Sequence, residues 1–344
     1  MIKDYFNNLK KPILIAEISG NHNGSLRKAK KLILTAKKHG AKIVKLQSYS
    51  PDTITIKSNR PEFKIKDGLW KNTNLWDLYN KAQTPFSWHK ELFSYAKKIN
   101  ILCFSSPFDE SAVDLLEKLD CPFYKLASFE LTHIPLIKKI AKTKKPMIIS
   151  TGMGNLQEIN NAYKNAKKYG CPKIILLYCV SNYPSKKIDF NLNNIKILQD
   201  TFKCEVGLSD HSNDIIIAQT AIAMGVKIIE KHIALDNQKK GVDINFSLKG
   251  KEIKGFVNKI NEVNNILGKK KFFRSKKEMA NIKFRRSIYV TKDLIRGQKI
   301  TQNDIKIIRP NKGLEPNYYE RILGKKIKYN IKSGRPLKIK DIYF

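Results

Sequence analysis

Residues 204–233, CEVGLSDHSNDIIIAQTAIAMGVKIIEKHI, decide how the fold is interpreted. Two short apolar runs in this stretch flank a mostly apolar segment of helical length at 214–224. The order predicts a strand, a helix and a second strand, and a histidine follows each predicted strand: His211 and His232. In a parallel α/β fold the carboxyl ends of successive strands lie side by side, so we expect the two imidazoles to converge.

Two convergent imidazoles beside carboxylates suit a divalent metal ion that keeps open coordination positions for a substrate. The simpler alternative for the same pattern is a pair of hydrogen-bonded histidines without a metal. The polar residues that follow the other predicted strands favour the metal site.

The alternation of strand and helix continues through most of the chain. Eight strands, each followed by a helix, are predicted at 12–19, 41–48, 101–105, 123–128, 146–150, 173–179, 204–208 and 226–229. Continuous apolar strands joined by helices indicate a parallel sheet that is buried on both faces. Eight repeats favour a closed (β/α)8 TIM barrel of the α/β class over an open doubly wound sheet. No GxGxxG motif follows a strand, so a dinucleotide-binding fold has no support.

One long segment, residues 49–83, interrupts the alternation of strand and helix after the second strand. The next helix is expected at 86–100, with Ser87 as its N-cap. Long loops after strands of this kind often carry function. Trp70 lies in this segment, and we hypothesise that the segment partly covers the site. An aromatic residue packed in the core is the alternative.

The alternating strand–helix pattern of the sequence ends after residue 268. We expect a barrel domain at 1–268, a basic linker at 269–285 and a small, mostly β domain at 286–344, with strand-like runs at 287–290, 305–308 and 337–339. A domain as small as the last has a marginal core of its own and gains stability by docking on another surface.

Composition limits the classes of partner. The chain of 344 residues carries 66 Lys and Arg against 30 Asp and Glu, a net charge of +36. Such a charge raises the possibility of nucleic acid as a partner, but the lysines are spread over the polar faces of many predicted helices, which is typical of a solvated surface. Only residues 269–274, KKKFFR, combine basic and aromatic residues as a nucleic-acid site would. We therefore expect no nucleic acid as a partner.

The five cysteines form no CxxC pair, which indicates buried thiols in a reducing compartment. No apolar run reaches membrane-spanning length and the N-terminus lacks an apolar signal segment. We therefore expect a cytoplasmic protein that has no membrane partner.

Polar residues follow nearly every predicted strand, and in a barrel they face one mouth. The set comprises Glu17, Lys45, Gln47, Ser106, Lys125, Ser128, Glu130, Ser150, Ser181, Tyr183, His211, Glu230 and His232. Two ammonium groups with several hydroxyls make a good site for a phosphate or a carboxylate. Glu17 and Glu230 are each interpreted as a general base or as a counter-ion of Lys45 or Lys231, and the sequence does not separate these roles.

Several strings in this order resemble the sialic acid synthase family over nearly the whole chain. They are AEISGNHNGS (16–25), KLQSY (45–49), FSSPFD (104–109), YKLASFE (124–130), ISTGM (149–153), GLSDHS (207–212) and IEKHI (229–233). The resemblance implies a (β/α)8 barrel followed by an antifreeze-like domain. It also implies condensation of phosphoenolpyruvate with an open-chain amino sugar to give a nine-carbon α-keto acid and phosphate.

Further strings, among them YSPDTITIKS (49–58) and DGLW (67–70), resemble a branch of the family whose sugar is 2,4-diacetamido-2,4,6-trideoxy-altrose. A relative that uses N-acetylmannosamine or another mannose-type amino sugar is the alternative. The sequence decides between these sugars only by resemblance, since pocket shape sets such specificity.

The resemblance also implies roles for individual residues. His211 and His232 would bind Mn²⁺ or Mg²⁺, Glu17 would be a base, and Glu130 and Glu230 would lie close to the reacting centre. Phosphoenolpyruvate would be held by Lys45, Ser106, Lys125, Ser128, Ser150 and Ser181, and the sugar by Gln47, Tyr183 and Asp243. Arg309 would reach from the small domain into the barrel of a partner subunit, which implies a domain-swapped homodimer.

Three positions depart from the family pattern. Ser106 stands where many members have Thr, and Ser181 stands where sialic acid synthases have Asn. Residues 241–244, GVDI, replace the more usual Gly-Pro-Asp-His, a change consistent with a different sugar.

Overall fold

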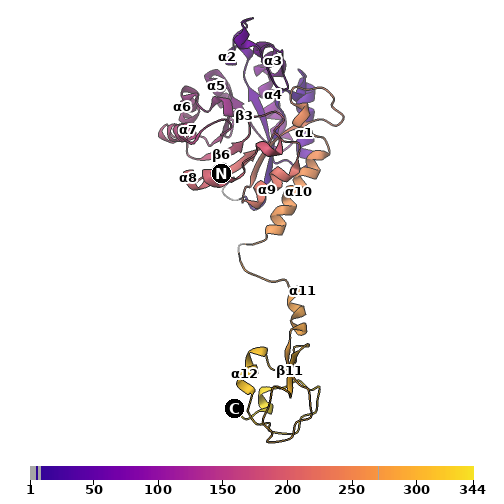
Figure 1. Cartoon of the computed structure of the whole chain (residues 1–344). Helices are drawn as coiled ribbons and strands as arrows, with labels where there is room; N and C mark the ends of the chain where they lie inside the picture. Colours follow the sequence, from indigo (N-terminus) through magenta and orange to yellow (C-terminus); the bar gives the residue numbers. More distant parts are fainter. Residues whose placement is uncertain (1–4, 7–8, 270) are drawn as a thin grey trace. The chain divides into compact units, whose positions relative to one another are not determined.

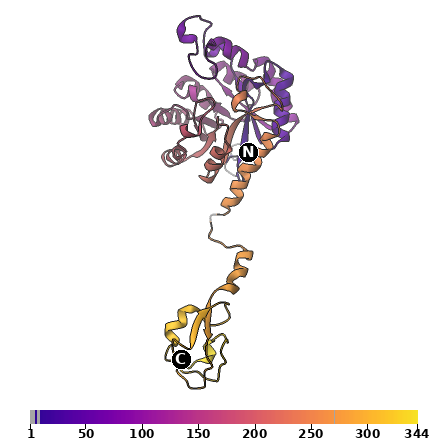
Figure 2. The same ribbon diagram turned by 45° about the vertical axis from the view of Figure 1, so that its right-hand side comes forward.

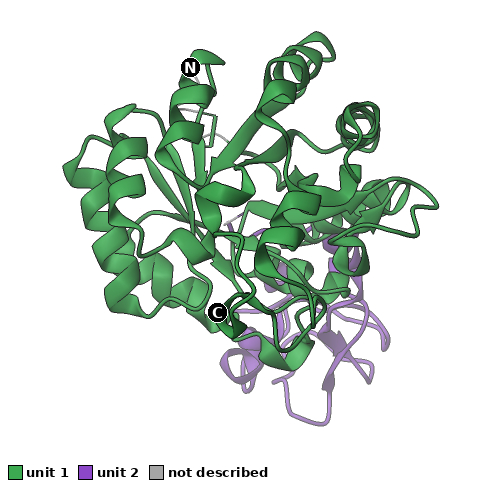
Figure 3. Ribbon diagram, turned by 90° about the horizontal axis from the view of Figure 1, so that it is seen from above, with its two compact units in different colours: residues 1–268 green, residues 269–344 purple. Residues whose placement is uncertain are grey.

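The computed structural model describes residues 5–6, 9–269 and 271–344 (Figure 1). These residues form two compact units, Met1–Gly268 and Lys269–Phe344, which Figure 3 draws in separate colours. Each unit has its own hydrophobic core.

The first unit is a closed barrel of eight parallel strands. In chain order they are β1 (Ile13–Glu17), β2 (Ile43–Ser48), β3 (Leu102–Pro107), β4 (Tyr124–Leu126), β5 (Met147–Ser150), β6 (Ile174–Cys179), β7 (Glu205–Ser209) and β8 (Ile228–Ala234). Each strand pairs with the next, and β8 pairs with β1 to close the sheet. The predicted TIM barrel is therefore confirmed.

Helices surround the barrel and cover its outer face (Figure 2). They are α1 (Leu26–Lys38), α4 (Phe86–Lys98), α5 (Glu110–Lys118), α6 (Ile134–Lys142), α7 (Leu156–Lys168), α8 (Asn193–Phe202), α9 (Ile215–Ala223) and α10 (Glu252–Leu267). In α7, for example, Asn155 and Glu158 form a capping box, and Ile159, Ala162 and Ala166 are buried at helical spacing. Local capping and an apolar stripe therefore fix both the start and the inward face of this helix.

The register of the closing strands brings three polar residues together. Glu17 at the end of β1 is level with Lys45 on β2 and with His232 on β8. Adjacent strands lie less than 5 Å apart, so side chains of level residues that point the same way are in contact. Closure of the barrel thus creates the polar centre of its mouth.

The segment between β2 and α4 has more structure than a loop. It contains α2 (Pro51–Ile54), a 3-10 turn at Pro61–Phe63 and α3 (Leu75–Ala82). Leu78 and Ala82 of α3 are buried. The segment is therefore packed against the barrel.

Three local expectations are wrong. The N-cap of α4 is Pro85 and not Ser87, so the helix begins at Phe86, two residues before the start that a Ser87 cap would give. His232 lies within β8 and not after it, because this strand continues to Ala234. A short strand, β9 (Leu248–Lys249), follows β8 and was not expected.

The second unit is built around a small apolar core. Its antiparallel strands are β10 (Ser287–Val290) and β11 (Ile305–Ile308), as expected, and it also contains α12 (Tyr319–Ile322). The expected strand at 337–339 is absent from this described unit, where a 3-10 turn forms at Ile339–Asp341. The stretch expected as linker contains α11 (Lys276–Met279) and a further 3-10 turn, Ala280–Phe284.

All five cysteines are free thiols, and four of them are buried. In the described part of the chain, none of the helices has the length and apolar character needed to span a membrane.

Gly207 on β7 packs closely against the neighbouring strands of the barrel. A Cβ atom there would lie 2.6 Å from the carbonyl oxygen of Ile228 and 2.6 Å from Leu177 Cδ2. We predict that Gly207→Ala lowers the free energy of unfolding by about 1–3 kcal/mol, because overpacking forces neighbouring strands apart. The measurement is urea unfolding followed by circular dichroism.

The matched control is Gly255→Ala in α10, where a Cβ would meet no atom within 4 Å. This change should stabilise the protein by about 0.5–1 kcal/mol, the helix preference of Ala over Gly. Equal effects of the two substitutions would contradict the packing described for β7.

Candidate active site

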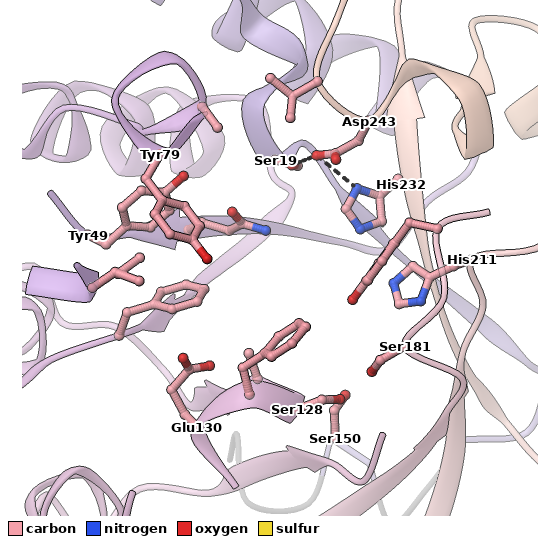
Figure 4. A pocket seen from close by; sticks show the side chains of 18 of the residues that line it. Ser19, Tyr49, Tyr79, Ser128, Glu130, Ser150, Ser181, His211, His232 and Asp243 are labelled. Atoms are coloured by element: carbon pink, nitrogen blue, oxygen red, sulfur yellow. Dashed lines mark hydrogen bonds and ion pairs between the residues drawn. The ribbon is translucent and has the colours of Figure 1, made fainter. Parts of the chain in front are cut away.

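A cavity of about 430 Å³ opens at the carboxyl ends of the barrel strands (Figure 4). Most of the residues predicted for the site line it: Lys45, Gln47, Lys125, Ser128, Glu130, Ser150, Ser181, Tyr183, His211, Glu230, His232 and Asp243. Glu17 is fully buried behind Lys45, and Ser106 is buried without reaching the cavity wall. The structure therefore brings nearly the whole predicted set into one chamber.

Four buried charges form a connected cluster at one wall. Lys45 Nζ lies 2.8 Å from Glu17 Oε2 and 3.0 Å from Glu230 Oε1. Lys125 Nζ lies 3.3 Å from the same Glu230 oxygen, which also accepts a hydrogen bond from Ser209 Oγ at 3.0 Å. Both glutamates are therefore counter-ions of lysines at the mouth, one of the two roles that the sequence left open.

The expected alternative partner, Lys231, lies elsewhere. It pairs with Asp210 at 3.0 Å and donates to the carbonyl oxygen of Ser212. Successive residues of a strand point to opposite faces, so Lys231 points away from the cavity that its neighbours Glu230 and His232 line.

The charges of the cluster are not equally well compensated. Burial opposes the charge of Lys45, but Glu17 and Glu230 outweigh it and raise the pKa of Lys45 above its ordinary value. Burial acts to raise the pKa of Glu230, but Lys125 and Lys45 hold it well below its ordinary range. Burial lowers the pKa of Lys125, since Glu230 compensates only in part. A further anion in the cavity would stabilise the Lys125 ammonium most.

Three serines that line the same cavity as Lys125, namely Ser128, Ser150 and Ser181, lie close together in the lower part of Figure 4. Ser128 Oγ accepts a hydrogen bond from the backbone N–H of Gly152 at 3.1 Å. A Cβ at Gly152 would lie 2.1 Å from Ser181 Oγ and 2.8 Å from Ser128 Oγ, so only glycine fits between them. Ser150 Oγ is buried and has no hydrogen-bond partner among the described residues. Serine hydroxyls in the same cavity as a partly compensated ammonium, one of them without a partner, form a site for an anionic ligand.

The two histidines lie side by side on another wall, with ring centroids 5.3 Å apart. His211 Nδ1 lies 3.2 Å from the carbonyl oxygen of Val180, and His232 Nδ1 lies 3.6 Å from Asp243 Oδ2. Burial, and then the neighbouring imidazole, lower the pKa of His211 well below its ordinary value. A neutral ring whose Nδ1 faces a protein oxygen keeps Nε2 free to act as a ligand.

This pair fits a divalent cation held by two protein ligands. No group of three His, Cys, Asp or Glu side chains arranged to hold a metal occurs in the described ranges. Any cation bound by the pair would therefore complete its coordination with water and substrate, as open catalytic sites do. The buried Nδ1 of His232 forms no hydrogen bond within the described chain, because its nearest carboxylate oxygen, Asp243 Oδ2, lies 3.6 Å away.

The segment between β2 and α4 supplies another wall of the cavity, which is mostly apolar apart from Tyr49 and Tyr79. Ile54, Ile65, Trp70 and Leu75 line it. The Trp70 ring lies 5.7 Å from that of Tyr183 across the mouth, and its Nε1 donates to the carbonyl oxygen of Val242 at 3.1 Å. This segment therefore borders the site and is tied to the loop that follows β8.

Glu130 lies between the polar and apolar walls, opposite the histidines in Figure 4. Burial raises its pKa to about 7, and its Oε2 is buried without a hydrogen-bond partner in the described chain. Close to neutral pH, this carboxyl group can therefore donate a proton or a hydrogen bond to a ligand.

Sequence reasoning missed several residues of the chamber. Ser19, Tyr49, Tyr79 and Ser209 all line the cavity. Ser19 donates a hydrogen bond to Asp243, a residue 224 positions away, which no local pattern reveals. Arg309 is exposed in the second unit, and its expected role in a partner barrel stays a prediction.

Family models match both parts of the chain. The model of the NeuB family matches residues 32–272, and that of the SAF domain matches residues 285–342. The first match covers more than half of the chain and contains every residue predicted for the mouth except Glu17.

Individual relatives agree with these matches. The chain is 41% identical to a pseudaminic acid synthase of Campylobacter jejuni over 98% of both sequences. It is 40% identical to a pseudaminic acid synthase of Helicobacter pylori, over 97% of this chain and 98% of the relative. A solved structure of N-acetylneuraminic acid synthetase from Leptospira borgpetersenii covers 79% of this chain and 91% of its own, with a TM-score of 0.70 and 31% identity.

The raised pKa of Glu130 predicts a pH-dependent effect of Glu130→Gln. Between pH 4.5 and 7 the unfolded carboxyl ionises while the folded one stays protonated, so the wild type loses stability as pH rises through this window. The variant avoids this loss and should gain roughly 2 kcal/mol over the wild type by pH 7.5, allowing for partial exposure to solvent. Urea unfolding from pH 4 to pH 8 measures the difference.

Glu262→Gln, at an exposed position in α10, is the control and should show no such trend. If the stability difference between Glu130→Gln and wild type stayed constant across this range, the carboxyl of Glu130 would have an ordinary pKa.

Proposed function

The chain belongs to the NeuB family, the sialic acid synthase family that its motifs resemble, and on this premise we propose that it is a pseudaminic acid synthase. The enzyme would condense phosphoenolpyruvate with 2,4-diacetamido-2,4,6-trideoxy-altrose and water to give pseudaminic acid and phosphate. One observation carries the reaction type: two lysines, a serine cluster and a pair of histidines line the same cavity. The similarity to pseudaminic acid synthases along the full chain supports the choice of sugar.

Phosphoenolpyruvate binds beside Lys125 in this proposal. Its phosphate and carboxylate supply the anion that Lys125 lacks, and they accept hydrogen bonds from Ser128, Ser150 and Ser181. Ser106 is buried away from the cavity wall, so its expected contact requires a movement of the ligand or of β3.

His211 and His232 hold the divalent cation, Mn²⁺ or Mg²⁺, through their free Nε2 atoms. When bound, the cation supplies Lewis acidity toward the aldehyde oxygen of the sugar. The protein itself contributes two imidazoles: Nδ1 of His211 lies 3.2 Å from the carbonyl oxygen of Val180, and Nδ1 of His232 lies 3.6 Å from the Asp243 carboxylate.

The reaction forms one carbon–carbon bond and one carbon–oxygen bond to water, and it breaks the carbon–oxygen bond to phosphate. The enol carbon of phosphoenolpyruvate attacks the aldehyde carbon, and water adds to the cationic carbon that bears the phosphate group. Phosphate then leaves with the electrons of its carbon–oxygen bond, and the proton that the water loses balances the alkoxide formed from the aldehyde. The resemblance implies Glu17 as the base for this proton; because Glu17 is buried as the counter-ion of Lys45, that role requires water to reach its carboxylate. Lys45 and Lys125 stabilise the departing charge.

The apolar wall accounts for the sugar. A 6-deoxy sugar presents a methyl group where mannose-type sugars present a hydroxyl. The side chains facing it would be those of Ile54, Ile65, Trp70 and Leu75. Their one hydrogen-bonding group is the indole N–H of Trp70, which already donates to the carbonyl oxygen of Val242. Burying a hydroxyl against such a wall without a partner is unfavourable.

The assembly follows from the family resemblance alone. We propose a cytoplasmic homodimer in which Arg309 of each second unit binds the acyl group of the sugar in the partner barrel. The exposure of Arg309 leaves its guanidinium available for this contact.

Phosphate release tests the reaction and the sugar together. We predict that the protein releases phosphate from phosphoenolpyruvate in the presence of Mn²⁺ with the trideoxy altrose sugar, and that EDTA abolishes the release. N-acetylmannosamine and the 2,4-diacetamido mannose analogue should react at least tenfold more slowly. Faster release with either mannose-type sugar would keep the reaction and reject the sugar, whereas no release with any sugar would reject the proposed function.

Trp70→Ala tests the apolar wall. We predict that KM for the trideoxy sugar rises about tenfold, because the sugar loses an apolar contact, while KM for phosphoenolpyruvate changes less than twofold. Trp76→Ala is the control in the same segment: its indole donates to Asp52, and its side chain does not line the cavity. Similar kinetics for Trp70→Ala and wild type would remove Trp70 from the sugar site.

A further inference from the structure

Ser19 has a backbone conformation that its residue type disfavours. It follows β1 directly, and its φ angle is +44°, in the left-handed region. Glycine adopts this region freely, whereas an L-residue with a side chain pays roughly 1 kcal/mol or more for it. Ser19 is also 2% exposed, so contact with solvent does not explain the side chain.

The side chain and backbone of Ser19 connect two carboxylates of the site. Its hydroxyl donates a hydrogen bond to Asp243 Oδ2, and its backbone N–H donates to Glu17 Oε1 at 2.7 Å. The left-handed conformation allows both bonds from one residue. Glycine would keep the bond to Glu17 and lose the bond to Asp243.

Asp243 in turn lies against the histidine pair. The carboxylate oxygen that accepts from Ser19 is 3.6 Å from His232 Nδ1, and Figure 4 shows the three residues as one chain at the cavity edge. The backbone around Asp243 is held independently, since its N–H donates to Asn21 Oδ1. The hydroxyl of Ser19 therefore fixes the carboxylate group and not the loop that carries it.

We propose that Ser19 is a positioning residue that holds the Asp243 carboxylate against His232 Nδ1, and that its strained backbone persists for this purpose. The inference deepens the proposed function and rests on it where the sugar and cation are concerned. With the carboxylate fixed, His232 keeps its Nδ1–H directed at Asp243 and its Nε2 directed at the ligand. Without the hydroxyl, the carboxylate can rotate away and the imidazole loses its fixed orientation.

Two substitutions at position 19 separate positioning from backbone strain. Ser19→Gly removes both the hydroxyl and the strain, so we expect Tm to stay equal or rise by about 2–4 °C, while kcat/KM and Mn²⁺ affinity each fall about tenfold or more. Ser19→Ala removes the hydroxyl and keeps the strain, so the same functional losses should come with an unchanged or lower Tm. Calorimetric titration of Mn²⁺ into the full chain gives the affinity independently of turnover.

The matched control is Lys203→Gly. Lys203 also has a left-handed φ angle, +48°, but it is exposed at the end of α8, before the amino end of β7. This variant should gain Tm like Ser19→Gly and keep wild-type kinetics and Mn²⁺ affinity. It shows what relief of strain does without any change at the site.

A double-mutant cycle tests the route through Asp243. In an Asp243→Ala background, Ser19→Gly should change kcat/KM and Mn²⁺ affinity less than twofold, because the carboxylate it positions is gone. Independent, additive losses would overturn the proposal, as would wild-type Mn²⁺ affinity in Ser19→Gly. If the wild-type protein releases no phosphate with any sugar, the proposed function fails, but Mn²⁺ affinity and Tm of the variants still decide the role of Ser19.

Discussion

The carboxylate of Glu230, shared between the ammonium groups of Lys45 and Lys125, is the interaction on which the mouth of the barrel depends. Three strands, β2, β4 and β8, each contribute one of these charges. A buried ion is unfavourable unless its partners surround it, and removing one partner of such a pair typically costs about 3–5 kcal/mol. The barrel can therefore hold two buried lysines at its mouth only because its register places Glu17 and Glu230 beside them.

The cavity divides into surfaces of different chemistry around this cluster. Lys125 and the serines suit an anion, the histidines offer imidazole nitrogens as ligands, and the wall from the segment between β2 and α4 is mostly apolar. A substrate with charge at one end and a methyl group at the other is therefore oriented before any bond forms. Glu130, with a pKa of about 7, is placed where these surfaces meet.

Much of this arrangement was predictable from the sequence, for a physical reason. Apolar runs that alternate with helical periodicity specify strands and helices locally. Because a parallel barrel places the carboxyl ends of all its strands at one mouth, Lys45, Lys125 and His211 could be grouped from the sequence alone. What escaped prediction depends on geometry between distant segments. One example is the hydrogen bond from Ser19 to Asp243, and another is the burial that raises the pKa of Glu130. A third is helix α3, which forms inside the inserted segment. Ser87 was the expected cap of α4 because its residue type suits the position, but Pro85 starts that helix.

The pairing of β1 with β8 has a consequence for biosynthesis on the ribosome. β1 is made first, but its second neighbour is the last of the eight barrel strands to emerge, and Glu230 emerges with it. Until then the growing chain carries Lys45 and Lys125 without their shared counter-ion, and β1 presents an open edge. Contacts so distant in sequence form late and slowly. The chamber is therefore completed only in a chain whose barrel has been synthesised through β8, so a ribosome that stops earlier releases no partially active product.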